Sequence, residues 1–274
     1  MTDIPSVNLG RGVAMPMVGF GTWQLHGELA YEATRHALQA GYRHIDTATM
    51  YRNEEQVGRA LADSRLDRAD VFVTTKLPPG SAGRARVTIA ESLKALGTDY
   101  VDLWLVHWPP RGRNLVPLWR DFIAVRDEGL ARTIGVSNYS IAQIDELAEA
   151  TGERPAVNQI PWSPSRSDAD LHAAHAERHV ALEGYSPLKG TRLRDRTLSE
   201  IAAKYHVSPA QVVLRWHIQL GNVVIPKSVT PARIEENFRI FDFELDPSQV
   251  EQIDALDRGE EGRTGPHPVQ FARS

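Results

Sequence analysis

The sequence predicts an α/β fold in which eight parallel strands close into a (β/α)8 TIM barrel. The chain has 274 residues, a usual length for one such barrel. Short β-rich runs alternate with helical stretches along its whole length, and no linker divides it. We therefore expect a single domain over residues 1–274, with 259–274 as a C-terminal loop or tail. An open doubly wound sheet is the alternative, but no expected strand is followed by a GxGxxG turn.

The expected strands are short, and several are apolar throughout, as strands buried on both faces of a parallel sheet should be. In chain order they are Met17–Phe20, Tyr42–Asp46, Val71–Thr75, Val101–Val106, Ala131–Val136, Ala156–Ile160, Val180–Glu183 and Val223–Ile225.

Stretches with apolar residues three to four positions apart separate these runs and predict helices. In chain order the expected helices are Leu29–Ala40, Glu54–Ala62, Ala85–Leu96, Leu115–Glu128, Ile141–Glu149, Ala169–Glu177, Leu198–Tyr205, Pro209–Leu220, Pro231–Phe238 and Pro247–Leu256. Three starts are supported by capping residues. Ser140 and Ser208 each precede a Gln by three positions, as in a capping box, and Asp246 is expected to be an ordinary N-cap.

Charge and composition exclude several classes of function. The net charge of −4 gives no general attraction to nucleic acid or to an anionic membrane. The absence of cysteine excludes disulfides, thiolate zinc sites and cysteine nucleophiles. No apolar run approaches the ~18 residues of a membrane helix, and the first residues lack the features of a signal peptide. We expect a monomeric, cytoplasmic protein without a metal.

Four polar residues lie at or shortly after the downstream ends of apolar runs: Asp46, Tyr51, Lys76 and His107. In a parallel barrel these strand ends share one rim, so the four side chains would meet in one pocket. Each residue alone has a structural explanation, such as capping a turn or contacting solvent. The combination at matching strand ends favours an active site.

Reduction of a carbonyl by a nicotinamide hydride is the simplest reaction for this group. Tyr51 can donate a proton to the carbonyl oxygen as negative charge develops there. An adjacent Lys76 ammonium would lower the pKa of the phenol from its usual ~10 and strengthen the acid. Asp46 would orient Lys76, and His107 would hydrogen-bond the substrate oxygen.

One expected helix start carries positive charges at the positive end of the helix dipole. In Thr230-Pro-Ala-Arg233 the cap and the proline suit a helix start, but Arg233 and the preceding Lys227 put cations at its positive end. A bound phosphate would reverse the sign of that cost. The alternative is that Arg233 points to solvent or pairs with Glu236 or Glu244.

Three histidines share one expected helical face: His172, His175 and His179. Imidazoles at this spacing can bind zinc or nickel. Their neighbours are alanines and charged residues, so we expect a solvated helix face instead.

The chain resembles the aldo-keto reductase family, and within it the short bacterial reductases similar to 2,5-diketo-gluconate reductase. The resemblance covers nearly the whole chain and includes a GPHPVQF tail at 265–271. The matching segments are GFGTW (19–23), GYRHIDTATMYRNEEQVGRAL (41–61), TTK (74–76), LVHWP (105–109), GVSN (135–138), NQI (158–160), GYSPL (184–188) and IPKSVTPARIEENF (225–238).

The resemblance implies NADPH-dependent reduction of aldehydes or ketones, with Tyr51 as proton donor and Asp46, Lys76 and His107 beside it. It places the small carbonyl substrate among Trp23, Tyr51, His107 and Trp108. It assigns the cofactor to Thr22, Trp23, Asp46, Ser137, Asn138, Gln159, Tyr185, Ser186, Leu188, Lys227, Ser228, Val229, Thr230, Arg233, Glu236 and Asn237. Within this set, Lys227, Ser228 and Arg233 would bind the adenosine 2′-phosphate.

Two other functions remain open at this point. TIM barrels also carry Schiff-base aldolases, and Lys76 is a candidate for that chemistry. A protein that binds NADPH and reports on it without turnover is the non-catalytic alternative.

Overall fold

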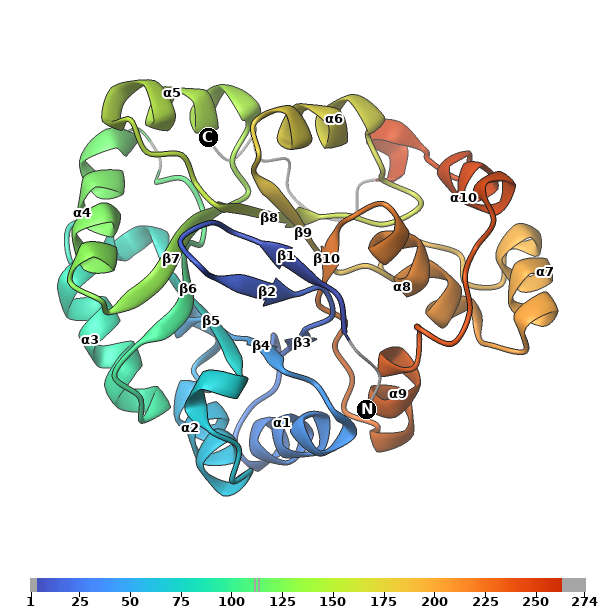
Figure 1. Cartoon of the computed structure of the whole chain (residues 1–274), viewed down its shortest axis with the longest axis horizontal. Coiled ribbons are helices and arrows are strands. Elements are labelled where there is room, and N and C mark those ends of the chain that lie inside the picture. Colours follow the sequence, from blue (N-terminus) through green and yellow to red (C-terminus); the bar gives the residue numbers. More distant parts are fainter. Residues whose placement is uncertain (1–3, 111, 113, 263–274) are drawn as a thin grey trace.

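The computed structural model describes residues 4–110, 112 and 114–262. Eight parallel strands form one sheet, neighbours in space following the order of the chain. They are β3 (Phe20–Gly21), β4 (His44–Asp46), β5 (Phe72–Leu77), β6 (Val101–Val106), β7 (Ala131–Ser137), β8 (Val157–Pro161), β9 (Ala181–Tyr185) and β10 (Val223–Val224). Val18 bridges Val224, and the Gly19 amide donates to the Val224 carbonyl oxygen at 2.9 Å. The last strand therefore meets the first, and the predicted barrel is confirmed (Figure 1).

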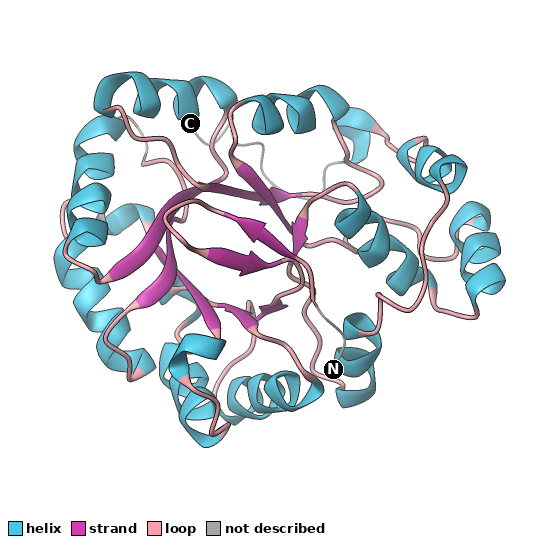
Figure 2. Ribbon diagram, in the orientation of Figure 1, coloured by secondary structure: helices cyan, strands magenta, loops and turns pink. Residues whose placement is uncertain are grey.

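Helices surround the barrel on its outside (Figure 2). They are α1 (Glu28–Ala40), α2 (Glu54–Asp63), α3 (Ala85–Leu96), α4 (Leu115–Asp127), α5 (Ile141–Thr151), α6 (Ala169–Glu177), α7 (Arg196–Tyr205), α8 (Pro209–Gln219), α9 (Pro231–Phe238) and α10 (Pro247–Asp254). Every expected helix is present, with ends that differ by at most two residues. Among the described residues, no helix is long and apolar enough to cross a membrane.

The expected helix starts are built as local chemistry dictates. Ser140 and Ser208 each form a capping box with the glutamine three residues later. Asp246, expected to be an ordinary N-cap, forms a complete capping box with Gln249. Its carboxylate accepts the Gln249 amide at 3.0 Å, while the Gln249 side chain accepts the Asp246 amide at 2.9 Å.

A hairpin that the sequence did not predict closes the amino end of the barrel. Strands β1 (Ser6–Asn8) and β2 (Ala14–Pro16) pair antiparallel and lie across the barrel in Figure 1. Met15 is buried in one apolar cluster with Phe72 and Val223, the first residues of β5 and β10. Because this end is filled, the carboxyl end of the strands is the one that remains for a site.

The expected C-terminal tail is described only in part. Gly259–Gly262 forms a short 3-10 turn after α10. The GPHPVQF segment at 265–271 lies outside the described residues.

Candidate active site

The four strand-end residues come together at the carboxyl end of the barrel. Asp46 is the last residue of β4, Lys76 lies near the end of β5, and His107 directly follows β6. Tyr51 ends a short 3-10 turn, Thr49–Tyr51, that follows β4. The rings of Tyr51 and His107 meet edge to face, with centroids 5.6 Å apart. Parallel pairing of β4 with β5 and of β5 with β6 thus brings the four predicted residues into one cluster.

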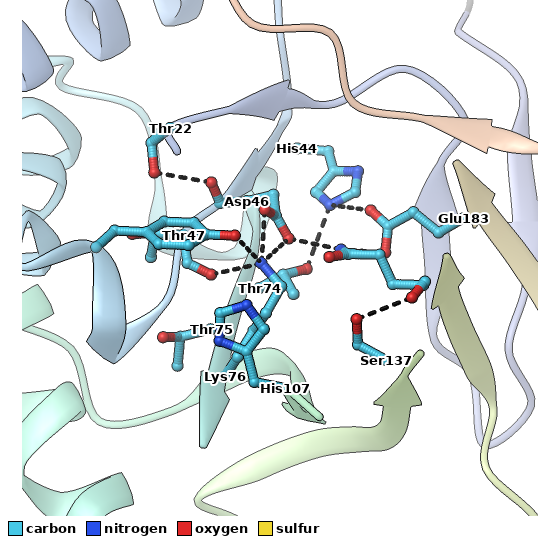
Figure 3. Close-up of polar contacts among 12 residues, drawn as sticks. Thr22, His44, Asp46, Thr47, Thr74, Thr75, Lys76, His107, Ser137 and Glu183 are labelled. Carbon is cyan, nitrogen blue, oxygen red and sulfur yellow. Dashed lines mark hydrogen bonds and ion pairs between the residues drawn. The ribbon is translucent and has the colours of Figure 1, made fainter. Parts of the chain in front are cut away.

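A buried ion pair lies at the centre of this cluster (Figure 3). Lys76 Nζ donates to both carboxylate oxygens of Asp46 at 2.7 Å, and to the carbonyl oxygen of Thr47 at 2.9 Å. The Tyr51 hydroxyl lies 3.4 Å from the same nitrogen. Burial lowers the pKa of Lys76, but Asp46, Tyr51 and Glu183 raise it by more, so the amine stays charged.

The phenol and the imidazole of the cluster are both held in their neutral forms. Burial raises the pKa of Tyr51, Lys76 lowers it, and the balance lies above the ordinary value of a phenol. The expected lowering by Lys76 is present, but burial outweighs it. Burial, with a smaller contribution from Lys76, lowers the pKa of His107 to about 3. The His107 Nδ1 atom is buried without a hydrogen-bond partner among the described residues.

The backbone around the ion pair is fixed by residues outside the predicted quartet. The amide and the hydroxyl of Thr22, a residue assigned to the cofactor, both donate to the Asp46 carbonyl oxygen, at 3.0 and 2.9 Å. Asn53, buried at the start of α2, accepts from the Thr47 hydroxyl and donates to the carbonyl oxygens of Thr22 and Leu25. These bonds tie the β3–α1 and β4–α2 loops together beneath the site.

Four of the residues assigned to the cofactor form one hydrogen-bonded group beside the quartet. The Ser137 hydroxyl donates to the Gln159 carbonyl oxygen at 2.8 Å, and the Asn138 amide group donates to Ser137 at 3.0 Å. The Tyr185 hydroxyl donates to the Asn138 side-chain oxygen at 2.9 Å. Gln159 joins this group to the ion pair, because its Nε2 donates to Asp46 at 2.8 Å.

The backbone is left-handed at two residues of this region. Asn138 has φ 63° and Ser186 φ 54°, conformations that residues other than glycine seldom adopt. Such conformations cluster at ligand sites, where the surrounding fold maintains them. Ser186 and the half-buried Leu188 follow β9 and lie in the segment that the family resemblance assigned to the cofactor.

The phosphate-binding segment predicted between β10 and α9 is open to solvent. Lys227 and Arg233 are exposed, and among the described ion pairs none joins Arg233 to Glu236 or Glu244. Thr230 is the N-cap residue of α9, but its side chain makes no capping bond. The remaining members of this assigned segment are Ser228 and Glu236, which are half-buried, Val229, which is exposed, and Asn237, which is buried. The segment lies next to the β3–α1 loop, since the Gly21 amide donates to the Pro226 carbonyl oxygen at 3.1 Å.

The two tryptophans assigned to the substrate follow β3 and β6. Trp23 is 48% exposed, and Trp108, directly after His107, is half-buried. Their positions flank the strand ends that carry Asp46 and His107. Exposed aromatic surface at this rim can contact the apolar part of a bound molecule.

Two buried residues of the site were missed. Glu183 of β9 accepts a hydrogen bond from Gln159 Nε2 at 2.9 Å, and its other oxygen lies 3.6 Å from His44 Nε2. His44 opens β4 and also contacts the Thr74 hydroxyl at 3.2 Å. A signal for Glu183 was present: it ends an apolar run, Val180–Glu183, just as Asp46 does.

The expectation of a solvated helix face is wrong for His175, and His179 lies beyond the end of α6. His175 is buried and lies 2.9 Å from the Asn158 side chain and 2.7 Å from the Leu171 carbonyl oxygen. His172 is half-buried against the side chain of Asn222, and only His179 is exposed. The inward side of the helix falls at His175, which polar groups of β8 and α6 satisfy. No cluster of three metal-binding side chains occurs in the part of the chain that the structure describes.

A cavity of about 780 Å³ lies apart from the quartet, between the β7–α5 and β8–α6 loops and the end of α10. Tyr139, Trp162, Asp168 and Asp257 are among its lining residues, and no member of the quartet is. The cavity and the cluster of reactive side chains therefore lie in different parts of the molecule. We place the site at the quartet, because there a phenol contacts a buried cation and an imidazole directly.

Comparison with known proteins agrees with this fold. A model of the Aldo/keto reductase family matches residues 17–258, so the chain belongs to this family and is an oxidoreductase. The methylglyoxal reductase DkgA of Escherichia coli K12 is 43% identical, with 99% of both chains covered. The crystal structure of an aldo/keto reductase from Brucella melitensis has a TM-score of 0.89 and 45% identity, and covers 93% of this chain and 100% of that one. The Bombyx mori aldo-keto reductase in complex with NADP has a TM-score of 0.90 and 33% identity over 96% of each chain.

Proposed function

We propose that the protein reduces aldehydes and ketones to alcohols with NADPH, and that Tyr51 donates the proton. The observation that carries the proposal is the contact between the Tyr51 hydroxyl and the Lys76 ammonium, which Asp46 holds through two 2.7 Å hydrogen bonds. A protonated phenol beside a fixed positive charge is suited to stabilise an oxygen that becomes negative. NADPH, when bound, supplies a hydride for the carbonyl carbon.

Tyr51 keeps its proton until the substrate oxygen acquires charge. Because burial raises the pKa of Tyr51, the phenol is protonated at neutral pH and available as an acid. As the proton leaves, the phenolate that forms faces the Lys76 ammonium, whose charge Asp46 maintains. The positive charge therefore favours the product of the proton transfer more than the starting state.

His107 aligns the substrate oxygen with Tyr51. Its ring is neutral, since burial lowers its pKa to about 3, and a neutral imidazole offers one N–H donor. The imidazole lies edge to face with Tyr51, so a donor on it can be directed to the same oxygen as the Tyr51 hydroxyl. Two donors from adjacent rings can meet one carbonyl oxygen, which selects one orientation of the substrate.

The residues around the quartet fit a nicotinamide dinucleotide. Gln159 turns its amide nitrogen to two carboxyls, so its amide oxygen faces away from them and can accept from a carboxamide. Tyr185 is held by Asn138 and offers a half-buried ring for stacking. At the other end, the exposed cations and the uncapped start of α9 suit a phosphate.

Small reactive carbonyls are the substrate class we propose to test first. The relative from Escherichia coli is named a methylglyoxal reductase. Methylglyoxal carries two adjacent carbonyls, so one can be reduced while the other occupies the rim beside Trp23 and Trp108. NADPH oxidation with methylglyoxal, followed in the purified protein, tests this directly.

Replacing Tyr51 by phenylalanine tests the assignment of the acid. We expect Tyr51→Phe to lower kcat by about 10²–10⁴-fold, the usual contribution of a general acid, with NADPH affinity unchanged. NADPH oxidation gives the rate, and cofactor fluorescence gives the affinity. Full activity in Tyr51→Phe would show that another group supplies the proton.

Replacing Arg233 by alanine tests the phosphate assignment. We expect Arg233→Ala to weaken NADPH far more than NADH, because only NADPH carries the 2′-phosphate. Arg239→Ala is the matched control, since Arg239 is an exposed arginine just after the same helix and pairs with Glu235. Equal weakening of both cofactors in Arg233→Ala would contradict the assignment.

The geometry disfavours the Schiff-base aldolase, whereas the NADPH sensor is distinguished by its turnover. A Schiff-base lysine must be neutral and accessible, whereas Lys76 is fully buried and ion-paired, and its pKa is raised. Borohydride trapping of a carbonyl on Lys76 would reverse this conclusion. An NADPH sensor would bind the cofactor tightly and show negligible turnover across aldehydes, keto sugars and α-keto esters.

A further inference from the structure

Glu183 is a fully buried carboxyl that the reaction described above does not use. It extends from β9 into the barrel, and one of its oxygens, Oε2, accepts from Gln159 Nε2 at 2.9 Å. Its other oxygen, Oε1, is buried and has no hydrogen-bond partner among the described residues. His44 Nε2 lies 3.6 Å from Oε1 (Figure 3). A buried carboxylate with an unsatisfied oxygen is costly, so this arrangement needs an explanation.

Gln159 connects Glu183 to the catalytic ion pair. An amide nitrogen carries two hydrogens, and here one is donated to Asp46 Oδ2 at 2.8 Å and the other to Glu183 Oε2. Asp46 Oδ2 also accepts from Lys76 Nζ at 2.7 Å. A continuous path of hydrogen bonds therefore runs from Glu183 through Gln159 and Asp46 to Lys76, which contacts Tyr51.

The surroundings of Glu183 favour a proton on its free oxygen. His44 Nδ1 lies 3.3 Å from the Pro16 carbonyl oxygen, which can only accept, so Nδ1 carries the hydrogen and Nε2 is an acceptor. A proton on Glu183 Oε1 would face that acceptor, which also lies 3.2 Å from the Thr74 hydroxyl. At 3.6 Å the two atoms are beyond hydrogen-bond distance, but the proton removes the repulsion between a carboxylate oxygen and the nitrogen lone pair. Burial, and next the nearby Asp46, raise the pKa of Glu183 to about 8.

Only one cation faces two carboxyls in this part of the barrel. Burial lowers the pKa of His44 to about 3, and that of His217 also to about 3. Of the described groups, Lys76 is therefore the one positive charge near Glu183, and Asp46 already engages it on both oxygens. The titratable groups that face Glu183 or lie behind its strand are Asp46 and His44 of β4, Lys76 of β5, Tyr51 after β4, and His217 of α8, against Gly184.

We propose that Glu183 is a positioning residue that supports Asp46 and Lys76 only while its own carboxyl carries a proton. Protonated, it anchors the Gln159 amide without adding charge. Ionised, it adds a negative charge that competes for Lys76 and disfavours loss of the Tyr51 proton, which weakens the acid. This inference rests on the proposed reductase function, whose rate should fall as Glu183 loses its proton.

Glu183→Gln tests the proposal, because it keeps the size and the hydrogen-bonding oxygen of the side chain but cannot ionise. In the wild type we expect kcat/KM for reduction to fall above pH about 8, by up to about tenfold per pH unit. In Glu183→Gln that fall should disappear or move to higher pH, while the rate at pH 6 stays within a few-fold of the wild type. An unchanged alkaline limb in Glu183→Gln would overturn the proposal.

Glu54→Gln is the matched control. Glu54 is a second buried glutamate whose pKa burial raises, and it bonds the Thr75 hydroxyl at 2.6 Å but neither Gln159 nor Asp46. Its replacement should leave the alkaline limb where it is in the wild type. If Glu183→Gln fails to fold, Glu183→Met provides a second side chain that cannot ionise. We expect it to lose the alkaline limb and, without an anchor for Gln159, to lower kcat at every pH.

Infrared difference spectroscopy separates this inference from the proposed function, because it needs neither substrate nor turnover. At pH 7 the wild type without cofactor should show a protonated-carboxyl band that is absent in Glu183→Gln, present in Glu54→Gln, and lost on titration through pH about 8. If the wild type shows the band but reduces no carbonyl, the proposed function fails and the protonation of Glu183 stands. If the Glu183 band is missing at pH 7, the positioning role is wrong whatever the activity.

Discussion

Replacing Asp46 by asparagine removes the charge that holds Lys76 while it keeps the shape of the side chain. In the wild type, Lys76 Nζ is fully buried, and the acceptors within 3 Å of it are the two Asp46 oxygens at 2.7 Å and the Thr47 carbonyl oxygen at 2.9 Å. In Asp46→Asn one of those acceptors becomes an N–H donor that faces the ammonium. The buried charge then loses its counter-charge and one hydrogen bond together.

The size of the effect follows from this burial. Removing one partner of a buried ion pair costs about 3–5 kcal/mol, because the other charge stays behind without compensation. We expect Asp46→Asn to lower the free energy of unfolding by that amount. Lys76→Met should also be destabilising, because it leaves the Asp46 carboxylate near Glu183. The double variant removes both charges, and we expect its loss to be about 2 kcal/mol or more below the sum of the two single losses.

Urea unfolding of the cofactor-free protein at pH 7, followed by tryptophan fluorescence, measures the four free energies. Glu200→Gln is the control, since it breaks an ion pair with Arg196 whose side chains are 90% and 63% exposed. That variant should cause no measurable loss. Additive losses in the double variant, or an Asp46→Asn protein as stable as the control, would refute the description of Lys76 and Asp46 as a buried, mutually dependent pair.

Two further predictions concern stability. The pKa of Glu183 is raised to about 8, so between pH about 4.5 and 8 the folded state keeps a proton that the unfolded state has released. As pH rises between these values, the free energy of unfolding of the wild type should fall relative to that of Glu183→Gln, by about 1.36 kcal/mol per pH unit. Unfolding free energies of both proteins from pH 5 to pH 9 measure this, and a constant difference would contradict it. Gly58→Ala should lower the free energy of unfolding by about 1–3 kcal/mol, since the added Cβ would lie 2.5 Å from the Leu96 carbonyl oxygen. Gly80→Ala is the control, because a Cβ there meets open space and the stability should not change. Equal urea midpoints for the two variants would disprove the close approach of α2 to α3.

The barrel could be predicted because its evidence is local. Each buried strand needs its own apolar run, and each covering helix needs its own apolar face, so both patterns are visible without knowledge of the fold. The first strand was the least accurate. Met17–Phe20 was expected, but the regular pairing covers only Phe20–Gly21, with a single bridge at Val18. The hairpin Ser6–Asn8 and Ala14–Pro16 was missed, because strands of three residues are too short for their alternation to be recognised.

The site was predicted only where one rule sufficed. Polar residues at strand ends identified Asp46, Lys76 and His107, and the same rule applied to Val180–Glu183 would have identified Glu183. Its partners could not be predicted, because strand position fixes the rim of the barrel but not which side chains meet across its interior. That depends on the register, which sets Gln159 of β8 beside Glu183 of β9. Lys227 and Arg233 were indicated by the cations at the start of α9, the other cofactor residues came from the family resemblance, and all these roles stay predictions.

The register of β8 and β9 couples the two carboxyls of the site. Gln159 lies beside Glu183 on the neighbouring strand and reaches across to Asp46, so two carboxyls share one amide group and one ammonium. Groups coupled in this way release protons as a set, and a midpoint seen in a pH profile belongs to the set and not to one residue. The acid strength of Tyr51 is then governed by the total charge of Lys76, Asp46 and Glu183. Since one positive charge balances only one carboxylate, the site can stabilise a developing phenolate only with the second carboxyl protonated.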